Sequence, residues 1–191
     1  METVTRAGIN INPETIETAA PLASNIMQGT KDAMGFVPNM YGFMANNPAL
    51  LDAYTHTYKT FRENAGFTPV EQEVIFLSVA YENECDYCVA AHSFVGDKMS
   101  GVPTEVTDAI REGKEIDDAK LSALSTFTRL MTRTRANVTS EDIATFLSAG
   151  YDENHILGVI TGIGVKTFSN YSNHLTNTPL DEMFQERKWS K

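Results

Sequence analysis

The sequence predicts an all-α protein, and three observations lead to this prediction. Apolar residues recur at intervals of three and four along most of the chain, the spacing of one helix face. The segments with this spacing are bounded by residues typical of helix starts and helix ends. No window shows the alternation of apolar and polar residues, bounded by hairpin turns, that marks a strand. We therefore expect the 191 residues to form one helical domain, 1–191, a bundle of about eight helices.

Each expected helix has its own boundary signals. Side chains that can accept a hydrogen bond from a free backbone N–H group mark four of the starts: Asn47, Thr68, Asp117 and Asp152. At the second of these, Glu71 completes a capping box with Thr68. Glycines mark four of the ends: Gly35, Gly101, Gly113 and Gly150. In chain order, these signals predict helices over 21–34, 48–64, 69–83, 85–100, 104–112, 118–134, 141–149 and 153–177.

Three other features bear on the fold. Residues 36–44 form an apolar connector, which either covers the core or lines a substrate pocket. Residues 179–191 are expected to be extended or loosely helical, with Trp189 as an exposed anchor or an oligomer contact. The final helix contains glycines that lower helix propensity, which indicates that another backbone packs closely and that this helix is central. These glycines are Gly158, Gly162 and Gly164.

The composition excludes some classes of partner. The formal net charge is −10 and the sequence pI is about 4.8, whereas nucleic acids and anionic membranes bind basic surfaces. The first residues lack the basic and apolar regions of a signal peptide, and no apolar run reaches the length of a membrane-spanning helix. We therefore expect a cytoplasmic protein that binds neither nucleic acid nor membrane. In the cytoplasm, a Cys-x-x-Cys pair is more often catalytic or metal-binding than a permanent disulfide.

The chemistry-bearing residues lie in the stretch 73–96. It contains the only two cysteines, Cys85 and Cys88, and His92 follows four residues after the second. On a helical wheel, both thiols and the imidazole line one face over about two turns, together with Val95 and Met99. The residues opposite are expected to face water: Asp86, Ser93 and Asp97.

A carboxylate, Glu73, lies in the middle of the apolar face of the preceding helix. The polar face of that helix is expected at Glu71, Ser78 and Glu82. An unpaired buried carboxylate is costly, so Glu73 should be either protonated or hydrogen-bonded to a specific partner. His92 is the obvious candidate. The alternatives are an Arg or Lys from elsewhere, or a position at the edge of the core.

These residue types favour thiol chemistry. Free N–H groups and the dipole at a helix start lower the pKa of a thiol, and the Cys-x-x-Cys spacing permits a disulfide. A nearby His can take the thiol proton, and a carboxylate can orient that His. A zinc site on Cys85, Cys88 and His92, with His155 or His174 as the fourth ligand, is disfavoured because three ligands on one helix converge poorly. We expect no metal and no cofactor, and an inert cysteine pair remains an alternative.

With Glu73, Cys85-x-x-Cys88-x-x-x-His92 and Gly96 in place, the sequence resembles the carboxymuconolactone decarboxylase-like superfamily, on its alkylhydroperoxidase D-like branch. The sequence segment AYENECDYCVAAHS resembles the peroxidase-related subgroup of that family. The close match covers about 68–100. One departure is Tyr87, because the best-known branch has a second His between the two cysteines.

The resemblance implies an all-α fold that assembles into a homotrimer or homohexamer, and a peroxidase cycle. It implies that Cys88 is the peroxidatic thiol, that Cys85 is the resolving thiol, and that Glu73 and His92 form the proton relay. The implied partners are a hydroperoxide substrate and a thiol reductant that the sequence does not identify. The departure at Tyr87 leaves open whether the same reductant and the same efficiency apply.

Two other functions remain possible on the same residues. A decarboxylase or lactone-processing enzyme on this fold would use His92 and Glu73 as acid–base groups, although that branch typically lacks the cysteine pair. A redox sensor that is not an enzyme would form the Cys85–Cys88 disulfide stoichiometrically and change its assembly without turnover.

Overall fold

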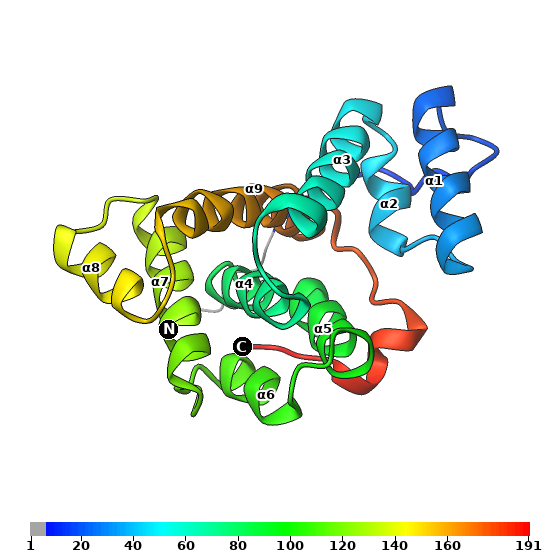
Figure 1. The fold of residues 1–191 in the computed structure, drawn as a ribbon. Helices are drawn as coiled ribbons and strands as arrows, with labels where there is room; N and C mark the ends of the chain where they lie inside the picture. The colour runs from blue at the N-terminus through cyan, green and yellow to red at the C-terminus, as the bar shows by residue number, and fades with distance from the viewer. Residues whose placement is uncertain (1–6) are drawn as a thin grey trace.

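A computed structural model describes residues 7–191, and the predicted all-α fold is confirmed: this part of the chain contains nine α-helices and no strand (Figure 1). A π-turn continues the fifth helix, and a 3₁₀ helix lies near the C-terminus. In chain order the helices are α1 Pro21–Met34, α2 Asn39–Met44, α3 Pro48–Asn64, α4 Pro69–Glu82, α5 Asp86–Val95, η1 Gly96–Ser100, α6 Thr104–Glu112, α7 Ala119–Thr134, α8 Ser140–Ser148, α9 Glu153–Thr176 and η2 Glu182–Arg187.

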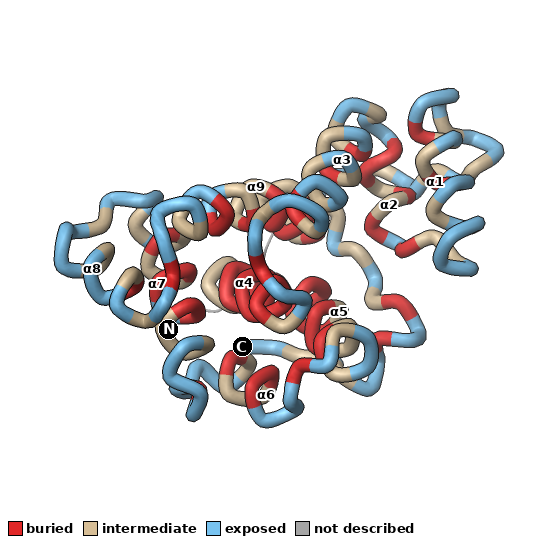
Figure 2. The backbone as a smooth tube through the Cα atoms, viewed as in Figure 1, coloured by how far each residue is buried: buried red, intermediate tan, exposed pale blue. Residues whose placement is uncertain are grey.

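The central element is α4. It contacts α5, α6, α7 and α9, and every residue from Glu71 to Ala80 is buried (Figures 1 and 2). The predicted polar face of α4 is therefore wrong at Glu71 and Ser78. The Ser78 hydroxyl is 2.8 Å from the Ser125 hydroxyl on α7, which satisfies both groups inside the core. The helix α9 also contacts α2, α3, α4, α5 and α7, but it leaves large apolar side chains such as Leu157 and Ile160 exposed, so α4 is the more enclosed of the two helices.

Local capping explains most helix boundaries. The side chains of Asn47, Thr68 and Asp152 each accept a backbone N–H at the start of α3, α4 and α9, as predicted. The start of α7 was predicted one residue too early: Asp118, and not Asp117, caps this helix by accepting from the Leu121 N–H at 2.9 Å. The predicted connector 36–44 also needs correction, because it contains the short helix α2.

The outer face of α5 is covered by α6 and by the C-terminal segment, which corrects two predictions of solvent exposure. Ser93 is fully buried, and its hydroxyl accepts a hydrogen bond from Arg111 at 2.9 Å. The Asp97 side chain is only 7% exposed and lies 3.0 Å from the guanidinium of Arg187. These partners come from α6 and η2, so spacing within α5 does not reveal them.

The C-terminal segment packs against its own chain. The indole N–H of Trp189 donates to the carbonyl oxygen of Arg111 at 2.9 Å, and the Trp189 ring lies 5.9 Å from that of Tyr81. Trp189 is therefore a partly buried anchor of the tail on α4 and α6. The predicted exposed position of this residue is wrong.

Two of the three glycines in α9 make the close packing that the sequence predicted. A Cβ atom at Gly158 would lie 2.8 Å from the carbonyl oxygen of Ala65, and one at Gly162 would lie 2.7 Å from Ile75 Cγ2. Gly164 differs, because a Cβ atom there would meet nothing within 4 Å. These glycines let α9 lie close to α3 and α4, the helices that position the candidate site.

Gly162→Ala is expected to lower the free energy of unfolding by about 1–3 kcal/mol, because the added methyl group overpacks the contact with Ile75 and Phe61. Gly164→Ala is the matched control in the same helix, and it should raise the free energy of unfolding by about 0.5–1 kcal/mol through helix propensity. Urea unfolding of the two variants checks this. Equal effects at the two sites would contradict the close packing at Gly162.

Candidate active site

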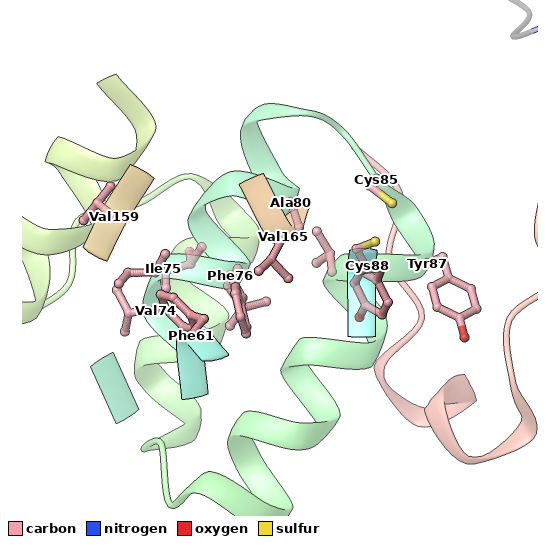
Figure 3. Packing of buried hydrophobic residues seen from close by; sticks show 14 of the residues in the cluster. Phe61, Val74, Ile75, Phe76, Ala80, Cys85, Tyr87, Cys88, Val159 and Val165 are labelled. Carbon is pink, nitrogen blue, oxygen red and sulfur yellow. The ribbon is translucent and has the colours of Figure 1, made fainter. Parts of the chain in front are cut away.

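The helices α4 and α5 bring the predicted residues together. Cys85 is the N-cap residue of α5, and Cys88 lies in its first turn. Both are free thiols and both are 1% exposed. Cys85 and Cys88 belong to the hydrophobic cluster that includes Ala80 and Val165, and they lie near each other in it (Figure 3).

Glu73 is hydrogen-bonded both to His92 and to an arginine, the two kinds of partner that the sequence analysis considers for it. Its Oε2 atom lies 2.8 Å from Nδ1 of His92, and its Oε1 atom accepts a hydrogen bond from Nη2 of Arg62. The Glu73 side chain is fully buried. Burial alone would raise the pKa of Glu73, but the hydrogen bonds from His92 and Arg62 and the charge of Arg62 outweigh it and hold that pKa below its ordinary value. Glu73 is therefore an ionised carboxylate inside the core.

Arg62 is itself held in place on α3. Its guanidinium donates to the Tyr58 hydroxyl at 2.8 Å and to Oε1 of Gln72 at 3.0 Å, in addition to Glu73. It also lies 4.8 Å from the centre of the Phe76 ring. This fixed cation offsets the charge of the buried carboxylate, as a buried charge requires.

His92 is neutral at pH 7. Burial is the main cause of a pKa lowered to about 4, the charge of Lys166 lowers it further, and Glu73 offsets only part of this. Because the ionised Glu73 only accepts, the proton of the neutral ring lies on Nδ1. The Nε2 atom therefore carries a lone pair and can accept a proton.

The two thiols have opposite pKa shifts. Burial would raise the pKa of Cys88, but hydrogen bonds from Cys85 and Asn173, the charge of Lys166 and the nearby amide of Asn170 lower it to about 6. The Asn173 amide donates to the Cys88 sulfur at 3.2 Å. Burial and the neighbouring Cys88 raise the pKa of Cys85 well above its ordinary value. These surroundings therefore favour ionisation of Cys88 over ionisation of Cys85.

Tyr87, at the place where the resembling branch has His, has a structural contact. Its hydroxyl donates to Oδ2 of Asp181 in a short buried hydrogen bond, and Asp181 Oδ1 accepts the Asn39 N–H at 3.0 Å. The Tyr87 ring points away from the Cys88 sulfur (Figure 3). This residue ties α5 to the start of α2 and to the C-terminal segment.

A cavity of about 210 Å³ lies between the start of α5 and the C-terminal part of α9, and of the two cysteines it is lined by Cys85. Its lining residues are Cys85, Asp86, Tyr87, Asn173, His174, Asn177 and Thr178. Met40 on α2 also lies close, because its sulfur is 3.8 Å from the Asn173 amide that donates to Cys88. The connector 36–44 thus contributes at least one side chain beside the thiols. A cavity of this size suits a small substrate.

Sequence reasoning missed three groups at this site: Arg62, Lys166 and Asn173. Lys166 is 1% exposed on α9, and it is the only lysine or arginine of that helix. A single cation within a long, mostly apolar helix is a signal that could have marked it, because buried lysines are rare unless paired. Nothing in the spacing of α3 indicates that Arg62 reaches Glu73.

Residues 7–191 contain no group of three or more His, Cys, Asp and Glu side chains that could hold a metal ion. In the same range, no helix combines the length and the apolar character needed to cross a membrane.

No family model and no curated protein sequence matches the chain. Solved structures do match. A structure described as the alkylhydroperoxidase AhpD core, an uncharacterized peroxidase-related protein from Ralstonia eutropha JMP134, has a TM-score of 0.81 at 18% identity and covers 95% of this chain and 97% of that one. A peroxidase-related protein from Silicibacter sp. TM1040 has a TM-score of 0.75 at 20% identity, with 96% of each chain covered.

A third match is the debrominase Bmp8, solved as a cysteine-to-alanine variant in complex with 2,3,4-tribromopyrrole. It has a TM-score of 0.73 at 16% identity and covers 97% of this chain and 96% of that one. The three proteins and this chain therefore share one fold over almost their whole lengths.

Proposed function

We propose that this chain, which has the alkylhydroperoxidase D-like fold, is a thiol-dependent peroxidase that reduces hydroperoxides through the Cys85–Cys88 pair. The observation that carries the proposal is the arrangement of two buried free thiols at the start of α5, in which only the Cys88 sulfur accepts a hydrogen bond from the Asn173 amide, at 3.2 Å. The surroundings of the two thiols shift their pKa values in opposite directions, downward for Cys88 and upward for Cys85. A two-thiol peroxidase needs this difference, because one sulfur attacks as a thiolate and the other must wait as a thiol.

In the first step, the Cys88 thiolate attacks the outer oxygen of a hydroperoxide. A sulfur–oxygen bond forms, the O–O bond breaks, and Cys88 becomes a sulfenic acid while the leaving alkoxide takes a proton to become an alcohol. The sulfur is oxidised by two electrons and the peroxide is reduced by two. The fixed hydrogen bond from Asn173 holds the Cys88 sulfur in position for this attack.

In the second step, Cys85 attacks the sulfenic sulfur. The Cys85–Cys88 disulfide forms and water leaves, which completes the oxidation of the pair. An external dithiol then reduces the disulfide by exchange and becomes oxidised itself. Both partners, the hydroperoxide and the dithiol, reach the pair through the cavity beside Cys85.

Glu73 and His92 act as the proton relay in this proposal. The ionised Glu73 fixes the imidazole through Nδ1, which leaves Nε2 as the site that takes and returns protons during the cycle. His92 lies four residues after Cys88 on α5, which places the imidazole one helical turn from the attacking thiol.

The reduced protein should consume cumene hydroperoxide or hydrogen peroxide for many turnovers when an excess of dithiothreitol is present. The matched control is the same protein after alkylation of its thiols with iodoacetamide, which leaves Glu73 and His92 intact. Loss of peroxide is followed by a colorimetric assay. Consumption no faster than that of the alkylated protein would reject the proposal.

Three alternatives predict other outcomes, one in the peroxide assay and two with other substrates. A single equivalent of peroxide consumed without turnover would indicate a redox sensor. Activity on a lactone acid that survives alkylation would indicate acid–base chemistry by His92 and Glu73. Release of bromide from a bromopyrrole would indicate reductive debromination, in which the two thiols become a disulfide as a C–Br bond is replaced by C–H. This last reaction is tested because a debrominase shares the fold.

A further inference from the structure

Cys88 is a buried thiolate that needs a positive charge nearby, and the proton relay does not supply one. The His92 ring is neutral at pH 7, and Arg62 is bonded to Glu73. A thiolate that is 1% exposed, with no cation beside it, would be protonated instead. The charge that balances Cys88 must therefore come from another element of the fold.

The helix α9 presents a row of polar side chains to α5. Lys166, Asn170 and Asn173 are spaced by four and three residues, so they lie on one face of the helix. All three are buried, at 1%, 0% and 5% exposure, and Asn173 contacts the Cys88 sulfur at 3.2 Å. We call these three residues the α9 donor face.

The ammonium group of Lys166 lies among the site residues. It is 5.5 Å from the centre of the Phe76 ring, and that ring is 4.9 Å from the ring of His92. Its charge is close enough to influence Cys88, Cys85 and His92 together. No carboxylate of the described residues lies within ion-pair distance of it.

The donor face also has unused capacity. The Nδ2 atom of Asn170 and the Oδ1 atom of Asn173 are buried without a hydrogen-bond partner in the described residues. The Oδ1 atom of Asn170 accepts from Asn83 at 2.9 Å, which fixes the amide so that its free donor is held in the interior. Buried polar groups without a hydrogen-bond partner are uncommon in proteins. They often occur at sites that stabilise a charge or bind a ligand.

The titratable groups around Cys88 on α3 and α5 are neutral at pH 7. These are Cys85, His92 and Tyr87 on α5 and Tyr54 on α3. The pKa values of Cys85, Tyr54 and Tyr87 are raised, chiefly by burial, so these groups keep their protons. Glu73 on α4 is ionised, but its charge is balanced by the hydrogen-bonded Arg62. Lys166 on α9 is the cation whose charge lowers the pKa of Cys88.

We propose that Lys166 is the positioning residue that holds Cys88 as a thiolate, with Asn170 and Asn173 as the neutral donors that complete the stabilisation of the sulfur. In this proposal, the site residues come from one helix pair and one further helix. The α4–α5 pair carries the relay of Glu73 and His92, and α9 supplies the balancing charge. This inference rests on the proposed role of Cys88 as the attacking thiol, and it is independent of the substrate that Cys88 attacks.

Lys166→Met tests the proposal in the full chain. Methionine has a similar length without the charge, and removal of a buried charge is compatible with a folded core. The apparent pKa of Cys88 is read from thiolate absorbance near 240 nm between pH 4.5 and 9, and mass spectrometry after iodoacetamide treatment identifies the reacting cysteine. We expect this pKa to rise by about one to two pH units, so that alkylation at pH 6 slows about tenfold.

A second measurement, the pKa of His92, distinguishes an effect of the Lys166 charge from an effect on local structure. The positive charge of Lys166 also lowers the pKa of His92, so Lys166→Met should raise that pKa, as followed by the imidazole signals in NMR with His92→Asn as the assignment control. A loss of local packing would not be expected to raise the pKa of Cys88 and the pKa of His92 together. Lys166→Arg keeps the charge and should leave the Cys88 pKa within about half a unit of wild type.

Lys59→Met is the matched control for the loss of one positive charge. Lys59 is an exposed lysine on α3, paired only with Glu63 at 3.9 Å, so both pKa values should stay unchanged in this variant. If Lys166→Met and Lys166→Gln both fold and leave the Cys88 pKa unchanged, the proposal is wrong. Peroxide turnover is not the readout, so the proposal and the peroxidase function can fail separately.

Discussion

Cys88→Ser is expected to abolish hydroperoxide turnover, with a loss on the order of 10³-fold or more. A serine hydroxyl does not ionise near neutral pH, so the variant has no anionic nucleophile at this position even though Asn173 can still donate to it. The measurement is the rate of peroxide consumption under the same dithiol excess as for the wild-type protein.

Cys85→Ser is the matched partner of this substitution. It removes the resolving thiol but leaves the attacking one, so the first oxidation should proceed and the cycle should stop there. The variant should consume about one equivalent of peroxide, and dimedone should trap a sulfenic acid at Cys88 by mass spectrometry. If Cys85→Ser loses the first oxidation and Cys88→Ser keeps it, the roles of the two thiols are reversed.

Glu73→Gln is expected to have the largest effect on stability, with a loss of about 3–5 kcal/mol in the free energy of unfolding. The substitution leaves the guanidinium of Arg62 without its buried counter-ion, and that side chain is only 20% exposed. It also removes the carboxylate that fixes His92 through Nδ1, so activity should fall as well. Urea unfolding at pH 7 measures the loss.

The effect of Glu73→Gln depends on pH in a defined direction. The pKa of Glu73 is lowered from 4.5 in the folded protein, so its contribution to stability is fully present above pH 4.5 and is lost as the pH falls through the lowered value. The difference between wild type and variant should therefore be constant at neutral pH and narrow only in acid. A difference that grows as the pH falls would show that Glu73 is protonated in the folded state.

Two controls isolate the buried pair. Glu63→Gln removes an exposed carboxylate, 57% exposed and paired with Lys59 at 3.9 Å, and should change stability by less than about 1 kcal/mol. Arg62→Met combined with Glu73→Gln removes both charges and should recover part of the loss. If Glu73→Gln costs no more than Glu63→Gln, the ion pair with Arg62 does not support the core.

Local sequence was enough to predict most of the helices and the register of the site. The capping box of Thr68 and Glu71 joins residues that lie within four positions of each other. Hydrogen bonds of this kind can therefore be predicted from neighbouring residues in the sequence. The spacing of Cys88 and His92 likewise fixes them one turn apart on α5. Even here, two adjacent aspartates, Asp117 and Asp118, were equivalent as caps from sequence, and only the structure shows which one accepts.

Tertiary packing decided which faces are buried and what surrounds the thiols. Ser78 and Ser93 were expected in water, but neighbouring helices cover them and supply hydrogen-bond partners. The spacing of apolar residues identifies the buried face of a helix that packs against one neighbour. The helices α4 and α5 have neighbours on several sides, so this spacing does not show all of their buried residues.

The sequence by itself determined that this protein is all-α, that its two cysteines start a helix, and that Glu73 needs a buried partner. Only the tertiary structure showed that Arg62 balances Glu73, that Asn173 contacts Cys88, and that Lys166 is buried with its ammonium group near the Phe76 ring. The physical reason is distance along the chain. Hydrogen bonds within a helix turn follow from spacing, but a charge on α9, more than seventy residues after Cys88, comes near it only through the packing of whole helices.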